Sequence, residues 1–500
     1  MKILVDLKPA LDGYAGIPQE SRLLLKGLNQ IDAFDVEGLI QHGERRLRPA
    51  LLVNTVLSPD KRIDRLSKFV VSLYEKPYDN LYQAAMGRIQ TSFARQILRL
   101  RANLGLSLPL SRFESDLFED FIWRTFFSKT LNAAAKPALQ GSRHRVLTVP
   151  RIQMHEAGLD GLTYSSSPSY ARIDTTGFDC FVTQTPFPGD VSSATQMVGR
   201  YHDAVPVPMP MPHTISDKAF HQASHFHAIK DNVRSEAWFS CISHATRADF
   251  LQLFPQAALR SAVIHNIVSD EYFVEDTPAH LVHQIIRNRM AVSDIVKAPK
   301  AGMISTDIAG EAAPVVYLLI VSTIEPRNNH QMFVQIWESL KYQSHPSLKL
   351  VAVGNVGWDY STVLDSFRPW AARGEVFWLN NVPSAELHTL YHHAAVTVCP
   401  GLAEGFDYSG VEAIKCGCVV AASEIPVHRK IYGDAAVYFD PYDAANATAQ
   451  LAKLVNPDAA PLREDLKSRG QSISQRYTEA AIIPQWIDFF GHVRGNVYFK

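Results

Sequence analysis

Residues 396–417 read Val396-Thr-Val-Cys-Pro-Gly-Leu-Ala-Glu404-Gly-Phe-Asp-Tyr-Ser-Gly-Val-Glu412-Ala-Ile-Lys-Cys-Gly417. The apolar start is typical of a buried parallel strand, and the end is typical of a short helix closed by a C-cap glycine. A strand, a tight turn and a helix N-terminus present free backbone N–H groups to an anionic ligand. Glu404 and Glu412 stand on either side of the turn and can accept hydrogen bonds from sugar hydroxyls. The stretch therefore predicts a site for a diphosphate joined to a polyol, as in a nucleotide sugar.

The same residues also have a purely structural interpretation. Ser409-Gly-Val-Glu412 has the spacing of a capping box, in which Glu412 only bonds a backbone N–H group at the helix start. Glu404 is then an ordinary acid of a loop. The pair alone does not decide between the two interpretations, and the sequence around it does.

The bulk composition is that of a globular enzyme with two or three domains. The 500 residues are 46% hydrophobic and 20% charged, with a net charge of −1, which gives no electrostatic case for a nucleic-acid partner. Met1-Lys-Ile-Leu-Val-Asp-Leu7 is expected to be a first strand and not a signal peptide. No apolar run is long enough for a spanning helix, and five cysteines in apolar runs predict reduced thiols. We therefore expect a cytoplasmic protein.

The last third of the chain alternates between apolar strand candidates and helix candidates. This order predicts a parallel sheet with helices on both faces, a Rossmann-like domain at 301–476. The strand candidates are 315–322, 349–354, 376–380, 396–400, 418–423 and 436–440, and the helix candidates are 329–342, 362–372, 385–394 and 410–416.

The first 300 residues are expected to form a second Rossmann-like domain with a helical insertion at about 55–140. Lys297–Pro314 is the predicted linker because it is rich in Ala, Gly and Pro. A last helix within 477–500 is expected to pack back on the first domain. The fold class is therefore α/β, with two parallel-sheet domains facing a cleft, where open α/β sheets bind ligands. The strand candidates of the first domain are 1–6, 145–149, 180–183, 196–201, 238–242 and 262–266.

Several motifs together resemble the retaining family-4 glycosyltransferases of the GT-B fold. The donor signature of that family, E-G-F-G-x-x-x-x-E-A, is similar to Glu404–Ala413. Ser322–His330 resembles the family's phosphate loop at a strand end, and Tyr201-His-Asp203 resembles its H-D segment. The remaining similar segments are Cys241-Ile-Ser-His-Ala-Thr-Arg247, Val263-Ile-His-Asn-Ile-Val268, Ile425-Pro-Val-His428 and Gly433-Asp-Ala-Ala436.

The resemblance implies roles for individual residues. Glu412 would accept hydrogen bonds from the ribose, and Glu404 would hold a hydroxyl of the transferred sugar. Arg327 would neutralise the leaving diphosphate, and His202 would meet the donor sugar near its reacting carbon. The other donor-binding residues that the resemblance implies are Gly405, Phe406, Asp407, Ser409, Gly410, Asn328 and Val382.

Two residues depart from the family pattern, and one motif is absent. Asn328 stands where the family commonly has lysine, and Asp407 replaces a glycine, so the expected phosphate site is less positive. Asp407 either repels the phosphates or points at a hydroxyl. The sequence has no D-x-D triplet, which favours metal-independent chemistry without a cofactor. No carboxylate stands out as a nucleophile, so we expect a same-face displacement that retains the anomeric configuration.

The prediction of an acceptor-binding site rests on two further segments. Gly13-Tyr-Ala-Gly16, followed by Gln19, resembles the family's glycine loop beside donor phosphate and acceptor. Arg88, Arg95, Arg99, Arg101 and Arg112 fall in a stretch without acidic residues, interleaved with Leu and Ile. This stretch is either a face for anionic lipid or a lipid-diphosphate acceptor, or a solvated basic face on a packed helix.

The sequence therefore predicts a cytoplasmic, retaining hexosyltransferase of polysaccharide biosynthesis, which the lipid-binding interpretation of the arginine stretch would place at the inner face of the membrane. The donor is a GDP-, UDP- or ADP-linked sugar, with mannose preferred from the resemblance, and the acceptor is a glycan or a lipid-linked glycan. Two alternatives stay open. One is another GT-B enzyme, such as a sugar-nucleotide epimerase or a phosphorylase, and the other is a non-catalytic scaffold of a polysaccharide assembly.

Overall fold

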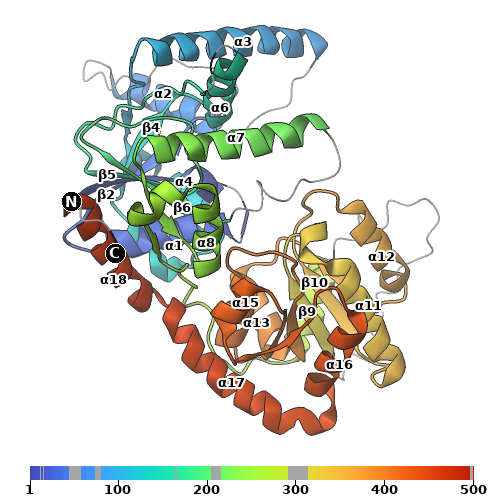
Figure 1. The fold of residues 1–500 in the computed structure, drawn as a ribbon. Helices are drawn as coiled ribbons and strands as arrows, with labels where there is room; N and C mark the ends of the chain where they lie inside the picture. The colour runs from blue at the N-terminus through green and yellow to red at the C-terminus, as the bar shows by residue number, and fades with distance from the viewer. Residues whose placement is uncertain are drawn as a thin grey trace. The chain divides into compact units, whose positions relative to one another are not determined.

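The computed structural model describes residues 1–11, 13–14, 16–43, 58–73, 80–163, 165, 167–203, 215–290, 314–495 and 499. They form two compact units, one made of Met1–Ile264 with Ile483–Lys500 and the other of His265–Ile482 (Figure 1). Residues 265–290 group with the second unit. The predicted boundary at 300–301 and all of the predicted linker except Pro314 lie outside the described residues.

The second unit has the doubly wound sheet that its alternating pattern predicts. Its strands are all parallel and lie in the order β11-β10-β9-β12-β13-β14. The central strand β9 is a continuous apolar run because helices cover both of its faces. The strand bounds are Tyr317–Val321 for β9, Lys349–Val353 for β10, Val376–Leu379 for β11, Val396–Cys399 for β12, Val420–Ser423 for β13 and Ala436–Phe439 for β14.

The helices of the second unit divide between the two faces of this sheet (Figure 1). The helices α11, α12 and α16 pack on one another on one face, and α13 and α14 pack together on the other. The chain adds β10 and β11 on one side of β9 and, after β11, returns to add β12, β13 and β14 on the other side. Because crossovers between parallel strands are right-handed, this reversal puts the two groups of helices on opposite faces of the sheet. The bounds are His280–Arg289 for α9, His330–Gln343 for α11, Ser361–Ala371 for α12, Ser384–His393 for α13, Tyr408–Lys415 for α14, Pro426–Tyr432 for α15, Ala444–Val455 for α16 and Ala460–Ser474 for α17.

The first unit contains an eight-stranded sheet in the order β3-β4-β2-β1-β5-β6-β7-β8. All neighbours are parallel except β3, which runs antiparallel to β4 at the edge. The sheet switches direction between β1 and β5, so the loops after these two strands meet at one edge. The bounds are Lys2–Asp6 for β1, Asp35–Gln41 for β2, Ser111–Phe113 for β3, Arg143–Leu147 for β4, Cys180–Thr183 for β5, Gln196–Tyr201 for β6, Trp238–Cys241 for β7 and Ser261–Val263 for β8.

The helical insertion lies between β2 and β4. Its long helix α3 packs along α6, as Figure 1 shows. The last helix, α18, reaches from the end of the second unit into the first, where Phe490 packs edge-on against Phe34 at 5.6 Å. The bounds are Ile17–Asn29 for α1, Pro59–Val71 for α2, Leu81–Asn103 for α3, Glu119–Ile122 for α4, Lys136–Leu139 for α5, Arg151–Asp160 for α6, Ile215–Arg234 for α7, His244–Leu253 for α8 and Glu479–Gly495 for α18.

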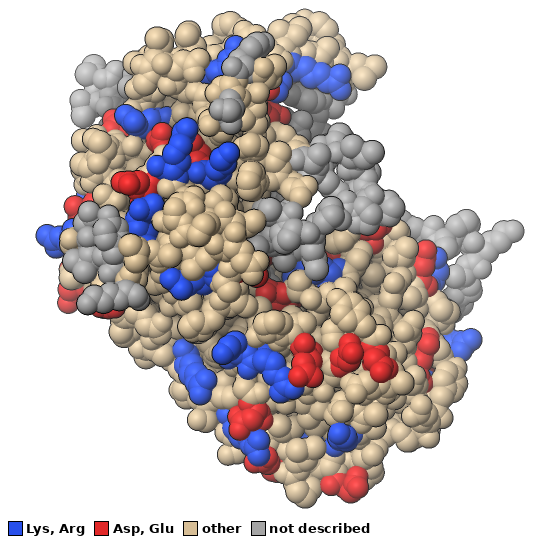
Figure 2. Space-filling model, in the orientation of Figure 1, with Lys and Arg blue, Asp and Glu red and all other residues tan. Residues whose placement is uncertain are grey.

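Three features of the surface and core bear on the expected class of protein. Acidic and basic side chains are interspersed over the face drawn in Figure 2. All five cysteines are buried and unpaired. Within the ranges that the structure describes, no helix is long and apolar enough to cross a bilayer.

Candidate active site

The candidate donor site is built on the two central strands of the second sheet. Its order reverses between β9 and β12, and such a switch point opens a crevice at the carboxyl ends of the strands. The loop after β9 carries Arg327, and the loop after β12 carries Glu404. The backbone joins the two loops, because the Leu402 N–H group donates to the Arg327 carbonyl at 2.9 Å. Two sequence motifs 77 residues apart therefore meet at one edge.

Arg327 lies between two carboxylates. Its Nη1 donates to Glu404 Oε2 at 3.0 Å and to the Ala403 carbonyl at 2.6 Å, and its Nε donates to Glu325 Oε1 at 3.0 Å. The Arg327 and Glu404 side chains are 19% and 20% exposed, so both reach solvent. A guanidinium held in this way presents a planar fork of donors that matches phosphate oxygens.

Glu404 has a raised pKa. Burial is the largest cause, the Arg327 guanidinium opposes it, and the nearby Asp407 carboxylate adds to it. A Cβ on Gly401 would lie 3.0 Å from Glu404 Oε1, so the glycine leaves this carboxylate its place in the loop. The result is a carboxylate that is positioned by an arginine and still open to a ligand hydroxyl.

Asp407 does not face open solvent as a free acid. It is the N-cap of α14: its Oδ1 accepts from the Gly410 N–H group at 3.3 Å and from Ser409 Oγ at 2.6 Å. Its Oδ2 lies 3.3 Å from Nε2 of the buried His428. Burial pushes the pKa of Asp407 upward, but His428, with hydrogen bonds from Cys399 and Ser409, outweighs burial and holds this pKa well below its usual range. The same pairing raises the pKa of His428 against the effect of its own burial.

Glu412 lies on α14 and is buried. The Tyr391 hydroxyl donates to its Oε2 at 3.0 Å. The capping-box interpretation of Ser409 and Glu412 is wrong, because the helix begins at Tyr408 and its cap is Asp407. Glu412 is therefore the fifth residue of the helix, two positions beyond the third residue, where a capping box requires its Glu or Gln.

The turn between the two glutamates is closely packed. Phe406 packs against Tyr408 and Tyr477, with ring centroids 5.2 and 5.3 Å away. A Cβ on Gly410 would overlap the Tyr432 hydroxyl, so only glycine fits there. Gly405 is buried next to Phe406. The turn from 404 to 412 is thus held by close packing, and the donor-binding role of its residues stays a prediction.

Asn328 lies in the loop after β9, and Val382 lies in the loop after β11, with β10 between these two strands in the sheet. Asn328 is buried, its Nδ2 donates to the Thr323 carbonyl at 2.7 Å, and its Oδ1 has no hydrogen-bond partner among the described residues. The following Asn329 has a φ of 55° and caps α11. Val382 is buried after Asn381, whose φ of 52° turns the chain after β11. The donor-binding role of Val382 stays a prediction.

The first unit places the glycine loop at its own switch point. Gly13 and Gly16 have φ values of 63° and 67°, which side chains with a Cβ rarely adopt. Gly16 precedes α1, on which Gln19 is buried. The buried Arg22 fixes the loop by donating to the carbonyl groups of Gly13 and Ala10 at 3.0 and 2.7 Å.

His202 follows β6 and lines a cavity of about 550 Å³ in the first unit. Its Nε2 lies 3.3 Å from Gln184 Oε1. Burial, with a contribution from the Arg200 charge, holds the pKa of His202 well below its ordinary value, so the imidazole is neutral. Gln184 Nε2 and the Tyr201 hydroxyl belong to the same cavity lining and have no hydrogen-bond partner within the described part of the chain.

Some of these partners were not predicted from the sequence. His428, Tyr391 and Gln184 contact site residues but belong to separate segments. His428 had a visible signal, since its Ile425-Pro-Val-His segment resembles a family motif, but no role followed from it. Tyr391 and Gln184 gave no signal, because their contacts depend on which strands are neighbours.

Comparison with known proteins agrees with this geometry. Residues 308–473 match the family described as glycosyl transferases group 1. O-antigen chain mannosyltransferase B of Escherichia coli is 27% identical over 162 residues, which cover 32% of this chain and 42% of that protein. The chain thus spans less than half of the length of this curated relative.

Two solved structures share the fold. Sucrose-phosphate synthase of Thermosynechococcus elongatus superposes with a TM-score of 0.57 at 14% identity, over 99% of this chain and 100% of that one. HepE of Anabaena, solved in complex with UDP-glucose, gives 0.52 at 12% identity, over 98% and 99%. The chain therefore has the GT-B fold of two Rossmann-like domains, and its residues 308–473 are a group 1 glycosyltransferase domain.

Proposed function

We propose that the protein is a retaining, metal-independent glycosyltransferase of polysaccharide biosynthesis. It moves a hexose from a nucleotide-diphosphate sugar to a glycan or lipid-linked acceptor. The observation that carries this proposal is the pairing of Arg327 with Glu404 at the switch point, with the buried Glu412 on the helix that follows. Cation, sugar-binding carboxylate and ribose-binding carboxylate are the three groups that a nucleotide-sugar donor needs.

Charge neutralisation is the first step of the proposed chemistry. Arg327 is bound to Glu325 and Glu404, and a diphosphate with more negative charge competes for the same fork of N–H donors. Asp407 does not oppose the diphosphate with a free charge, because His428 and the α14 backbone hold its carboxylate. Glu404 then accepts from a hydroxyl of the transferred sugar.

The transfer step proceeds as a same-face displacement. The bond between the anomeric carbon and the diphosphate oxygen breaks, and the acceptor hydroxyl oxygen bonds to the same face of that carbon. The acceptor proton passes to the leaving phosphate oxygen, so no protein nucleophile is needed. Analysis of the product by NMR tests this step: an axial anomeric linkage is expected from an axial donor, and an equatorial linkage contradicts it.

Mannose is the proposed hexose, and GDP-mannose the first donor to try. The support is the relative that is a mannosyltransferase of O-antigen synthesis. The acceptor is proposed to enter the cavity beside His202, where Gln184 and Tyr201 offer polar atoms without partners in the described chain. The contact of His202 with the donor sugar stays a prediction.

The proposal includes an attachment to anionic lipid through α3. The side chains of Tyr82, Ile89 and Phe93 are 73%, 64% and 64% exposed, and with Met86 and Leu100 they recur every three, four or seven residues on one side of the helix. No acidic residue occurs from Asn80 to Phe113, and Figure 2 shows basic side chains over the region of α3. An apolar stripe flanked by arginines is the pattern of an interfacial helix.

A non-catalytic scaffold is the second candidate. The observation that favours it is that two carboxylates already neutralise Arg327, while Asn328 brings no second cation.

Nucleotide release decides between the two. The purified chain is incubated with GDP-mannose and, separately, UDP- and ADP-sugars, plus a mannan oligosaccharide acceptor, and free nucleoside diphosphate is measured by chromatography. An enzyme releases one nucleotide per transfer, and Arg327→Ala slows release at least a hundredfold. Arg429→Ala is the control, because Arg429 is half-exposed and pairs only with Glu424 among the ion pairs described. No release from any donor supports the scaffold.

A further inference from the structure

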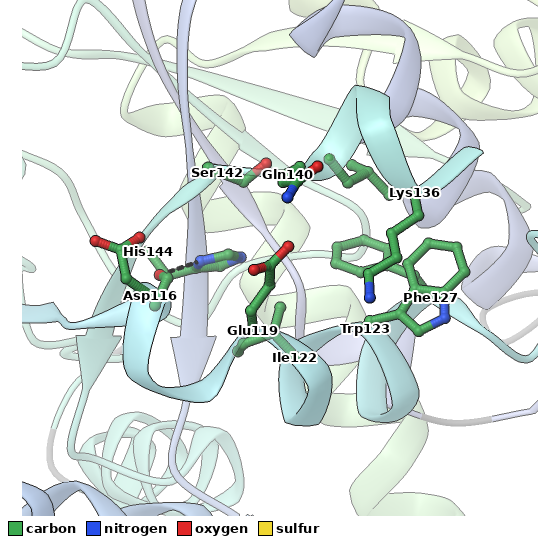
Figure 3. A pocket seen from close by; sticks show the side chains of 12 residues that line it. Asp116, Glu119, Ile122, Trp123, Phe127, Lys136, Gln140, Ser142 and His144 are labelled. Carbon is green, nitrogen blue, oxygen red and sulfur yellow. Dashed lines mark hydrogen bonds between the residues drawn. The ribbon is translucent and has the colours of Figure 1, made fainter. Parts of the chain in front are cut away.

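The helical insertion of the first unit contains a cavity that the proposed transfer reaction does not use. Its volume is about 90 Å³, and Figure 3 shows the side chains that line it. The residues come from the short helices after β3 and from the start of β4. The cavity is several times larger than the roughly 10–15 Å³ that a single water needs, and it is much smaller than the cavity of about 550 Å³ beside His202, so we expect a small ligand.

The cavity shares no lining residue with the cavity beside His202. Its His144 side lies at the amino end of the strands, whereas its floor is joined to the glycine loop through Arg22, which binds the carbonyl groups of both Phe126 and Gly13. His144 is the second residue of β4, at its amino end, whereas the glycine loop and His202 follow the carboxyl ends of β1 and β6. These three strands run parallel through their neighbours in the sheet. The cavity is therefore a separate place in the first unit and not an extension of the acceptor cavity.

Its floor is apolar and aromatic. Ile122, Phe127 and Leu139 are buried, and the half-buried Trp123 lies with its ring centroid 6.4 Å from that of Phe127. An aromatic surface of this kind takes the C–H face of a sugar ring, since that face is apolar.

The backbone under the floor is a π-helical turn, Trp123–Phe127. The Ser128 N–H group donates to the Trp123 carbonyl five residues back, at 2.9 Å. The buried Arg22 of α1 holds this turn, because it donates to the Phe126 carbonyl at 2.6 Å and to Thr130 Oγ1 at 3.0 Å. Single π turns inside helices occur often at functional sites, and here Trp123 is the first residue of the turn.

One polar side chain at the cavity is buried without a full set of partners. His144 is 1% exposed, and its Nδ1 lies 2.8 Å from Ser115 Oγ. Its Nε2 meets the geometric requirements of a hydrogen bond with none of the described residues, although the Ser142 backbone is near enough to the ring to oppose the effect of burial on its pKa. In Figure 3 this edge of the ring points toward the interior of the cavity. A buried ring nitrogen without a partner costs free energy, so a ligand group is expected to bind it.

A ligand hydroxyl is the group that suits this nitrogen. If Ser115 donates to Nδ1, Nε2 carries the proton and donates; if Nδ1 donates, Nε2 accepts. A hydroxyl satisfies both tautomers because it is both donor and acceptor. Burial lowers the pKa of His144 to about 4, so the ring is neutral and gives no charge to attract an anion.

The rim excludes phosphate and favours a neutral polyol. Asp116 and Glu119 bring two carboxylates, and Lys136 brings one ammonium group, so the rim is negative overall. Carboxylates accept hydrogen bonds from hydroxyls, and the Gln140 amide can both donate and accept. Figure 3 shows Glu119, Gln140 and Lys136 around the opening.

We propose that this cavity binds one neutral sugar ring of the polysaccharide, with the ring on Trp123, hydroxyls on Glu119 and Gln140, and one hydroxyl on His144. The identity of the glycan as acceptor or product rests on the proposed function; the binding of a sugar ring does not. Binding the polysaccharide at this second site, in the insertion, keeps the acceptor near the enzyme between transfers.

The test observes Trp123 directly. The chain has seven tryptophans, so the full-length protein labelled with 5-fluorotryptophan gives a small set of fluorine resonances, and Trp123→Phe identifies the one of interest. α-Mannotriose, maltotriose and cellotriose are titrated separately without nucleotide. We expect one of them to shift the Trp123 resonance saturably.

Matched variants tie the shift to the cavity. Glu119→Gln is expected to raise the dissociation constant at least fivefold, whereas Asp120→Asn, at the neighbouring exposed position outside the lining, leaves it within twofold. A Trp123 resonance that no trisaccharide moves overturns the proposal, as does equal affinity in Glu119→Gln and the wild type. Because no nucleotide is present, a chain that fails to release nucleotide from any donor contradicts the proposed function and leaves this result unaffected.

Discussion

Asp407 is an acid in the candidate donor site, at a position where the family that this chain resembles has glycine. An acid in place of a glycine predicts a weaker phosphate site. The structure uses this acid for two local purposes, as the cap of α14 and as the partner of His428. Its charge is thus offset inside the protein, and the expected repulsion of the donor is reduced.

The Asp407–His428 pair predicts a pH dependence of stability. The pKa of His428 is raised in the folded state, so its stabilising effect is full below its ordinary value of about 6.5 and is lost as pH rises through the raised pKa. The pKa of Asp407 is lowered in the folded state, so its ionised carboxylate stabilises the fold fully above about pH 3.9. This stabilisation is lost as the pH falls through the lowered pKa. Thermal unfolding is therefore expected to show falling stability above pH 6.5.

The variant Asp407→Asn is expected to flatten that slope and to lower the stability at pH 6. Asp443→Asn is the matched control, since Asp443 caps α16 by accepting from two backbone N–H groups. Asparagine caps a helix about as well as aspartate, so this variant is expected to lower the stability by well under about 1 kcal/mol and to leave the slope unchanged. A slope above pH 6.5 that is identical in Asp407→Asn and the wild type contradicts the pairing.

Glu412 predicts a separate effect on nucleotide affinity. Replacement by Gln removes the charged acceptor of the ribose hydroxyls, a contact worth roughly 1.5–3 kcal/mol, so calorimetry is expected to show affinity weakened by roughly 10- to 150-fold. Tyr391→Phe is the control, because it removes only the 3.0 Å contact to Glu412. Equal losses in the two variants would mean that Glu412 acts by packing alone.

At the scale of elements, the sequence predicts strands well where both faces are apolar. All six strands of the second sheet fall within the predicted ranges. The strands β2 and β3 were not predicted. Glu37 in β2 is buried because Arg145 and Lys2 pair with it at 2.6 and 3.1 Å, and β3 has only three residues at the sheet edge. Such strands depend on partners distant in the sequence.

Because α14 and α15 approach each other closely, adding one methyl group between them is expected to lower the stability of the fold. Gly410→Ala places a Cβ on the Tyr432 ring and hydroxyl, and overpacking of this kind costs about 1–3 kcal/mol. Gly491→Ala in α18 is the control, since a Cβ there meets nothing within 4 Å and alanine favours the helix. Denaturant unfolding is expected to separate the two, and a neutral Gly410→Ala would contradict the packing.

The exposed stripe of α3 predicts membrane binding. Wild type is expected to float with anionic vesicles and not with neutral phosphatidylcholine vesicles. The double variant Ile89→Ser with Phe93→Ser, and separately Arg88→Glu, are expected to reduce flotation at least fivefold. Tyr442→Ser is the control, because Tyr442 is 80% exposed in the second unit. Equal flotation of all variants would support the solvated-face interpretation.

At the scale of the whole molecule, alternation of strands and helices predicts two Rossmann-like domains, and the structure confirms them. The sequence cannot order the strands, so it cannot show that the loops of β9 and β12 are neighbours. That neighbourhood is what brings Arg327 to 3.0 Å from Glu404. Motif resemblance supplied the residues of the candidate site, and the sheet order supplied their contacts.

The central claim is that the second unit binds a nucleotide-diphosphate sugar through Arg327, Glu404 and Glu412. The most direct measurement is the thermal shift of the full chain with GDP-, UDP- and ADP-sugars, each compared with Arg327→Ala. A ligand at 100 times its dissociation constant stabilises the fold by about 2.7 kcal/mol. We predict a clear shift with one nucleotide, largest for GDP-mannose, that Arg327→Ala abolishes. A wild type that no nucleotide sugar stabilises, or a shift that survives in Arg327→Ala, would contradict the account.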